Sequence, residues 1–226
     1  MGNGRTMRIT GKGQVKVRPD VTRITMTLEG THPGYDEALR RSAQDTEQVR
    51  ELLTSLGLDG SDLKTLSFQV DTEYEVYQEE RSVTVQKKFV GYKFRHRMKV
   101  EFPSDNDRLG RILYGLAHCP ARPEFGISYT VKDQEAVRNE LLGRAVADAR
   151  DKAAVLAQAA GVSLKEIQSI DHSCGAIDFE VRPMGRAMAA GKADGMAAPL
   201  CASYDLDVEP DDIEVSDTVT VVWEIQ

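Results

Sequence analysis

Residues 133–161 read DQEAVRNELLGRAVADARDKAAVLAQAAG, and this stretch decides how the rest of the chain is arranged. Apolar residues recur in it at three- and four-residue spacing, which places them on one face of a helix. Asp133 stands where an N-cap is expected, and Gly161 stands where a left-handed residue would end the helix. We predict a packing helix without catalytic residues, whose mostly small apolar face consists of Leu142, Ala145, Ala149, Ala153, Leu156 and Ala160.

The solvent side of this helix should carry ion pairs between residues four positions apart. The pattern predicts three of them: Glu140 with Arg144, Arg144 with Asp148, and Asp148 with Lys152.

Composition limits the class of protein. The 226 residues are 41% hydrophobic and 29% charged, as in a soluble globular protein that buries a core. A net charge of -7 disfavours non-specific binding of the whole molecule to nucleic acid or anionic membranes. The three cysteines do not form a disulfide framework, and no apolar run is long enough for a membrane span.

The opening MGNGRTMRIT lacks the apolar core of a signal peptide. We expect a cytoplasmic location for the chain as written, and a periplasmic or extracellular one if a signal segment has been trimmed away.

Apolar–polar alternation predicts strands, and helical spacing predicts two further helices at 35–56 and 104–117. The apolar stripe of the first begins with Tyr35 and Leu39, and Ser104 with Asp107 resembles a capping box for the second. We predict an α+β (mixed α/β) fold, with three main helices on mostly antiparallel sheet in the order β-β-α-β-β-β-α-β-α-β-β. The predicted strands are 7–17, 21–30, 63–77, 83–89, 92–102, 125–131, 163–171 and 217–226.

We expect residues 1–226 to form a single domain. From Cys174 to about Pro210 the periodicity dissolves into Ala, Gly and Met. This composition predicts a mobile insertion at about 174–210, which is a possible contact region for a protein partner.

The clearest electrostatic feature is the strand at 92–102, which alternates aromatic or apolar residues with cations. Two lysines just before it extend the row of cations, and the strand upstream shows the same alternation with carboxylates. The basic stripe comprises Lys87, Lys88, Lys93, Arg95, Arg97 and Lys99, and the acidic row comprises Asp71, Glu73 and Glu75.

Three interpretations of these charges stay open. The stripe could bind nucleic acid or another polyanion, although its aromatic residues face the other way and cannot interleave with the cations as stacking platforms. The two strands could be neighbours whose charges complement each other, each exposed pair adding roughly a few tenths of a kcal/mol. The two rows could also lie on different subunits and orient an assembly. We favour neighbouring strands and keep the assembly as an alternative.

Four residues could ligate zinc if the fold brought them together. His118-Cys119 ends a predicted helix, and His172 and Cys174 follow a predicted strand. Their spacings match the usual zinc knuckle poorly, so a metal site is a minor alternative, as is a Cys119–Cys174 disulfide. His96 lies on the apolar face of its strand, where a core histidine is expected.

Motifs for nucleotide binding and catalysis are absent from the sequence. Gly11-Lys12-Gly13 lacks the strand–loop–helix context and the ending of a phosphate loop, so a bulge or close packing of a strand explains its glycines better. The chain has no GxSxG, HExxH, Walker or CxxC motif. We predict a protein that is not an enzyme and that has no catalytic residues and no cofactor.

Several stretches resemble the SIMPL family, in the right order along the chain. The opening ITGKGQVKVRPD at 9–20 is similar to that family's glycine-containing first strand and Pro-Asp turn. Gly91-Tyr92, the alanine-rich run at 145–157 with Gly161 after it, and the closing strand at 213–223 resemble further family motifs. Together they cover essentially the whole chain.

The resemblance implies a poorly defined function without established catalytic residues. Bacterial members are usually exported, and they include periplasmic immunogenic proteins and a protein linked to defence against oxidative stress. Some form ring-like oligomers. We expect a bacterial, non-enzymatic binding or assembly module, homo-oligomeric, in envelope or oxidative-stress physiology. The alternative is a polyanion- or ligand-binding protein that uses the basic strand at 87–99.

Overall fold

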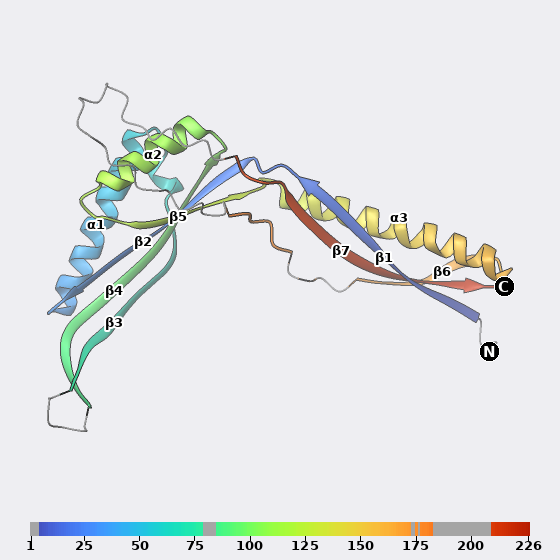
Figure 1. Cartoon of the computed structure of the whole chain (residues 1–226), viewed down its shortest axis with the longest axis horizontal. Coiled ribbons are helices and arrows are strands. Elements are labelled where there is room, and N and C mark those ends of the chain that lie inside the picture. Colours follow the sequence, from blue (N-terminus) through green and yellow to red (C-terminus); the bar gives the residue numbers. More distant parts are fainter. Residues whose placement is uncertain (1–4, 79–84, 173–174, 176, 183–208) are drawn as a thin grey trace. The chain divides into compact units, whose positions relative to one another are not determined.

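A computed structural model describes residues 5–78, 85–172, 175, 177–182 and 209–226 (Figure 1). These residues form two compact units, each with its own sheet. The first unit draws its described residues from Met1–Asp20, Thr130–Val181 and Pro210–Gln226, and the second from Val21–Tyr129 and Arg182–Glu209. Within the described residues, no helix combines the length and the apolar character that crossing a membrane requires.

The first unit is one long helix on an antiparallel sheet with the strand order β1-β7-β6. The helix runs along one face of the paired strands β1 and β7 (Figure 1). Its elements are β1 (Arg5–Val17), α3 (Gln134–Ala160), β6 (Leu164–Asp171) and β7 (Ile213–Ile225).

The ends of α3 confirm the predicted caps. The Asp133 carboxylate accepts a hydrogen bond of 2.8 Å from the Ala136 N–H, and Gly161 ends the helix with a φ of 67°. The buried face differs in part from the predicted one, because Leu156 and Ala160 are exposed. A strict four-residue spacing winds slowly around a helix of 3.6 residues per turn, so the buried face follows the twisted sheet below it. Its members are Val137, Leu141, Ala145, Ala149, Ala153 and Ala157.

The strand β1 packs backbone to backbone against α3. A Cβ atom on Gly11 would lie 2.0 Å from the carbonyl oxygen of Ala145, and one on Gly13 would lie 2.1 Å from that of Leu141. No side chain fits at either position. The two glycines therefore provide close packing of a strand, one of the two explanations that the sequence favours over a phosphate loop.

Part of the predicted insertion belongs to the core of the first unit. Phe179 is buried there, and Ile177 and Val181 pack against the same cluster. The prediction of a mobile insertion is therefore wrong for residues 177–181, whose alternation is too short to stand out in the sequence. Residues 183–208 of that prediction lie outside the described residues.

The second unit is a four-stranded sheet with the order β3-β4-β2-β5, in which β4 pairs antiparallel with both β2 and β3. The helix α1 lies over β2 and β4, and α2 packs beside α1, where Leu52 contacts Gly115. The elements are β2 (Val21–His32), α1 (Tyr35–Ser55), a 3-10 turn (Gly60–Asp62), β3 (Lys64–Gln78), β4 (Val85–Pro103), α2 (Asn106–His118) and β5 (Glu124–Thr130).

The strand β4 joins two strands that the sequence predicts separately. Its pairing with β3 runs through both, and a register shift after Glu73 leaves Val90 without an opposite residue. The interruption at Gly91, between the two predicted strands, is thus a bulge within one strand. The three helices and the antiparallel sheets are as predicted, but the part of the chain that the structure describes has seven strands instead of eight.

Two details of the helices in the second unit differ from prediction. Tyr35 and Leu39 are exposed on α1, because the buried stripe runs through neighbouring smaller residues instead. The N-cap of α2 is Asp105, whose carboxylate accepts a hydrogen bond of 3.0 Å from the Arg108 N–H. Ser104 is not the cap, and its hydroxyl lies 3.2 Å from that of Thr22.

Candidate functional site

The cations of the predicted basic stripe lie on the sheet of the second unit. Along β4, even-numbered residues from Phe94 to Phe102 are buried beneath the helices, so odd-numbered residues face the other way. Arg95 and Arg97 are exposed on this open face, and Lys93 and Lys99 are half-buried.

The strands β3 and β4 are neighbours, as the favoured interpretation predicts. Asp71 lies directly opposite Lys93, and Glu75 lies directly opposite Lys88. The opposite charges therefore face each other within one chain, although this register alone does not make them ion pairs.

Cations of the basic stripe form ion pairs with two other carboxylates, which we did not predict from the sequence. Glu29 on β2 pairs with Arg95 and, at 3.0 Å, with Lys93. Glu101 pairs with Lys99 at 3.0 Å and with Arg23 at 2.6 Å. The alternation of the two strands could have revealed them, because Glu29 and Glu101 each occupy a position on the polar face of their strand.

Both carboxylates are held in the charged form. Hydrogen bonds from Arg95 and Lys93 lower the pKa of Glu29. Burial opposes ionisation of Glu101, but the hydrogen bonds from Lys99 and Arg23 outweigh it and lower that pKa too. Much of the positive charge on this face is therefore neutralised within the unit.

The six cations do not form one stripe. Lys88 lies opposite Glu75 on the open face, whereas Lys87 lies opposite Val76 and so points to the other side of the sheet. The prediction is wrong for Lys87, because consecutive residues of a strand alternate between faces.

The acidic row of β3 has fewer ion pairs with opposite charges than the basic stripe has. Glu73 lies opposite Gly91, which offers no side chain. Gly91 itself must be a glycine, since a Cβ atom there would lie 2.3 Å from the carbonyl oxygen of His32. Among the described residues, no cation lies within 4.0 Å of Glu73 or Glu75. The hydrogen bond and charge of Glu29 chiefly raise the pKa of Arg95, and Asp71 is near enough to add to that effect.

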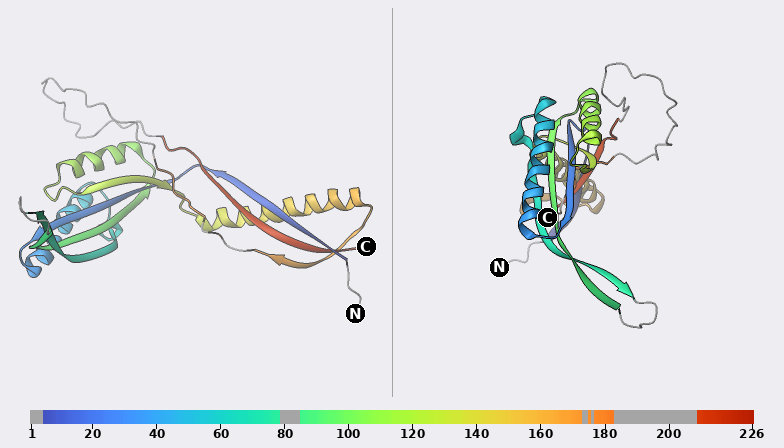
Figure 2. Two further views of the ribbon diagram at one scale, coloured as in Figure 1. Left: turned by 60° about the horizontal axis from the view of Figure 1, so that its bottom comes forward. Right: turned by 90° about the vertical axis from the view of Figure 1, so that its left-hand side faces the viewer.

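An aromatic row extends over the helix side of the same ribbon. The rings of Tyr35 and Tyr92 lie 5.4 Å apart, those of Tyr92 and Phe89 lie 5.4 Å apart, and those of Phe89 and Tyr74 lie 5.7 Å apart. Tyr35, Tyr74 and Phe89 are 48%, 50% and 45% exposed. Figure 2 shows the far end of the β3–β4 ribbon extending past α1.

His96 is the core histidine that its position predicts. Thr46 donates its hydroxyl proton to the Ser42 carbonyl oxygen over 2.7 Å, so it can only accept from His96 Nδ1 at 3.0 Å. In the neutral ring Nε2 then accepts from the Thr65 hydroxyl at 2.9 Å. Burial, followed by the charge of Arg50, lowers the pKa of His96 and favours this neutral form. Both ring nitrogens are occupied, so His96 is a structural residue.

The candidate zinc ligands are divided between the units. His118 and Cys119 belong to the second unit, where His118 Nδ1 lies 2.8 Å from the Tyr114 carbonyl oxygen. His172 belongs to the first unit, and its Nε2 lies 2.8 Å from Asp217 Oδ2. Cys174 lies outside the described residues. Within the described ranges, no group of three or more His, Cys, Asp or Glu could hold a metal ion.

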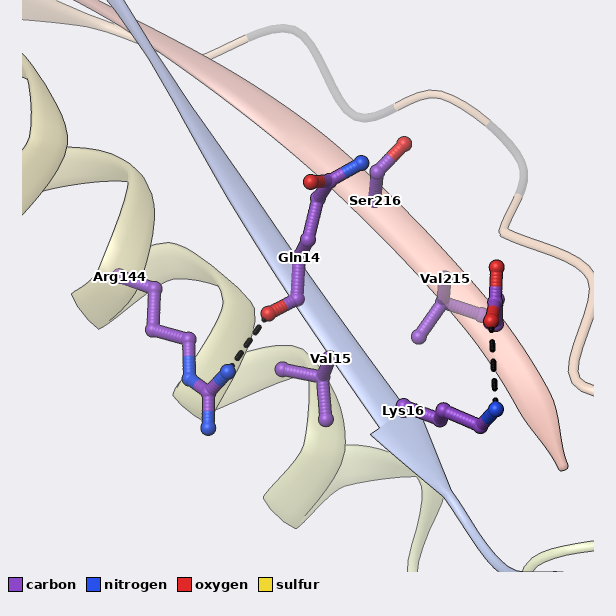
Figure 3. Close-up of a pocket in the computed structure, with 7 residues that line it drawn as sticks. Gln14, Val15, Lys16, Arg144, Val215 and Ser216 are labelled. Atoms are coloured by element: carbon purple, nitrogen blue, oxygen red, sulfur yellow. Dashed lines mark hydrogen bonds and ion pairs between the residues drawn. The ribbon is translucent and has the colours of Figure 1, made fainter.

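The first unit has an open depression of about 430 Å³ between α3 and the β1–β7 pair (Figure 3). Neither of its cations is unpaired. Arg144 binds the Gln14 carbonyl oxygen at 2.7 Å and Glu140 at 2.6 Å, and Lys16 lies 3.5 Å from Glu214. We therefore assign no ligand to this depression, which is lined by Gln14, Val15, Lys16, Arg144, Glu214, Val215 and Ser216.

Comparison with known proteins confirms the resemblance seen in the sequence. The chain belongs to the SIMPL family, described as protein of unknown function (DUF541), whose match spans residues 7–223 and so both units. The 26 kDa periplasmic immunogenic protein of Brucella melitensis biotype 1 is 23% identical over 218 residues, which cover 96% of this chain and 84% of that protein. The protein of the same name from Brucella abortus strain S19 gives the same values. The family description and these names specify no biochemical activity.

Proposed function

We propose that the protein is a non-enzymatic assembly module that forms homo-oligomers through its second unit. The observation that carries the proposal is the exposed aromatic row of Tyr35, Tyr74 and Phe89. Clustered exposed aromatic residues mark association surfaces in soluble proteins. A two-stranded ribbon is also marginally stable by itself, so covering its apolar face would stabilise it.

A second copy of the chain is the occupant that we favour for this row. The row combines rings from α1, β3 and β4, and two such rows can pack symmetrically in an isologous interface. We place the assembly in envelope or oxidative-stress physiology. Two observations support this placement: the family resemblance, and the word periplasmic in the names of two relatives. We propose a periplasmic location for this chain on the same grounds.

Light scattering on the purified protein tests the proposal. We expect a discrete oligomer for the wild type and a folded monomer for the double variant Tyr74→Lys/Phe89→Lys. The matched control is Ile167→Lys/Ile170→Lys, because these two side chains are equally exposed but lie on β6 of the first unit. A wild type that is monomeric at every concentration, or equal loss of assembly in both variants, would overturn the proposal.

The alternative function, binding of a polyanion by the basic strand, stays a prediction. Lys93, Arg95 and Lys99 are paired with carboxylates, whereas exposed Arg97 has no ion pair with any described residue. Titration with single-stranded DNA tests it. Tight binding that weakens with salt and is lost in Arg97→Glu would favour this function over assembly.

A further inference from the structure

We propose that the free edge of β3 binds an extended segment of another protein, in which apolar residues alternate with lysine or arginine. The inference goes beyond self-association, because it concerns the edge of the sheet and a different partner. It rests on the open hydrogen-bonding edge, on the two faces of β3, and on a comparison with β1.

The strand β3 is the terminal strand of its sheet. It is 15 residues long and pairs with β4 along its length, and no described strand pairs with its other side. Such an edge presents a row of unpaired backbone N–H and C=O groups, to which an extended chain can add by main-chain hydrogen bonds.

The edge of β1 shows how this fold closes such a row. The Lys12 N–H donates to Asp148 Oδ2 at 2.7 Å, and Arg144 donates to the Gln14 carbonyl oxygen at 2.7 Å. Side chains of α3 thus occupy backbone groups of β1 and block the approach of another strand. No described side chain bonds to the backbone of β3 at residues 64–76 in this way, so nothing in the described part of the chain closes this edge.

The two faces of β3 define what would fit beside it. On the helix side, Phe68, Tyr74 and Val76 are 44%, 50% and 63% exposed. On the open side lies the acidic row, in which Glu73 faces a glycine and Glu75 has no ion pair with a described residue. Neighbouring strands pair residues on the same face, so an added strand should place apolar residues on one side and cations on the other.

Two candidate segments of this chain are excluded, one by charge and one by a blocked edge. Antiparallel pairing of two β3 strands would set the acidic residues of one copy against those of the other, which is destabilising. The strand β1 has a suitable alternation, with exposed Arg8, Lys12 and Lys16 on one face, but α3 blocks its edge. A segment of a different protein is therefore the occupant.

Binding of a labelled decapeptide tests the inference. The probe alternates Lys with Val and Thr, and the control peptide carries Glu in place of every Lys. In fluorescence anisotropy we expect saturable binding of the Lys peptide that weakens with salt. The charge reversal Asp71→Lys/Glu73→Lys/Glu75→Lys should weaken it by about tenfold. The matched control Glu51→Lys/Asp151→Lys/Glu166→Lys changes net charge equally at exposed positions on α1, α3 and β6 and should bind like the wild type.

Hydrogen exchange separates strand addition from simple charge attraction. Bound peptide should increase the protection of amides in β3 and leave those of β1 unchanged. Unchanged β3 amides, equal binding of the Glu peptide, or equal loss in both triple variants would overturn the proposal. Light scattering on the same samples separates it from the proposed function, because the β3 triple variant should keep the mass of the oligomer.

Discussion

In the first unit, Gly11 and Gly13 bring β1 against the backbone of α3, whereas in the second unit Phe94 and Met98 fill the space beneath α1. Helix and sheet come into contact in the first unit because side chains are absent from β1 at these two positions, and in the second unit because large side chains are buried between them. Close approach places side chains of α3 at the edge of β1, where they bond to its backbone. In the second unit α1 lies over the inner strands β2 and β4 instead of the edge strand β3.

Truncation should be most damaging in the second unit. Phe94 is completely buried, and Phe94→Ala should cost about 3–5 kcal/mol of stability, because it removes a ring and leaves a cavity. Hydrogen exchange of β2 and β4 amides measures the loss. Phe125→Ala, at a 41% exposed position of the same unit, should cost under about 1 kcal/mol. Equal losses in the two variants would contradict this account of the core.

Enlargement should be most damaging in the first unit. Gly11→Val puts a side chain where only 2.0 Å separates its Cβ from the Ala145 carbonyl oxygen, and it should cost about 3 kcal/mol. Trp223 is the single tryptophan and lies buried in this unit, so its fluorescence during urea unfolding reports the loss.

The control for this enlargement is Gly143→Ala on α3 itself. Its new Cβ would meet nothing within 4 Å, so the better helix propensity of alanine should stabilise the unit by about 0.5–1 kcal/mol. Destabilisation by both substitutions would contradict the role given to close packing.

The buried histidine should make the second unit less stable at mildly acidic pH. Burial and Arg50 lower the folded-state pKa of His96 below the unfolded value of about 6.5. Between those two values the unfolded state binds a proton that the folded state does not. Stability is therefore full above pH ~6.5, falls as the pH drops toward the lowered pKa, and levels off below it. Urea unfolding across this range should show the slope, and His96→Leu should remove it.

The smallest effect concerns the edge of β1. In Arg144→Ala/Asp148→Ala, the Lys12 amide loses its acceptor while the α3–β1 packing stays. Exchange of the Lys12 amide should become faster, and the protein should aggregate more readily than the wild type. The control Lys152→Ala removes a partner of Asp148 but no bond to β1, so the Lys12 amide should stay protected.

The sequence predicted elements whose signals are local. The caps and small residues of α3 and the glycines of β1 could be recognised because each reflects backbone geometry at its own position. The ends of β4 could not, because Gly91 resembles a strand break until the pairing with β3 shows a bulge. The neighbouring charged strands were predicted correctly, but which carboxylates pair with the cations depends on strand order, and this placed Glu29 on β2 beside Lys93.

The strand order of the first unit also constrains the order in which the two units can fold during synthesis on the ribosome. β7 lies between β1 and β6, and Thr10 pairs with Thr220 across 210 positions of the chain. Residues 21–130, which contain every described strand and helix of the second unit, emerge before β7 does. Unit two can fold during synthesis, whereas β1 must wait for its partner. The nascent first strand, with its hydrophobic side chains, is thus a natural client for chaperones until translation reaches the last strand.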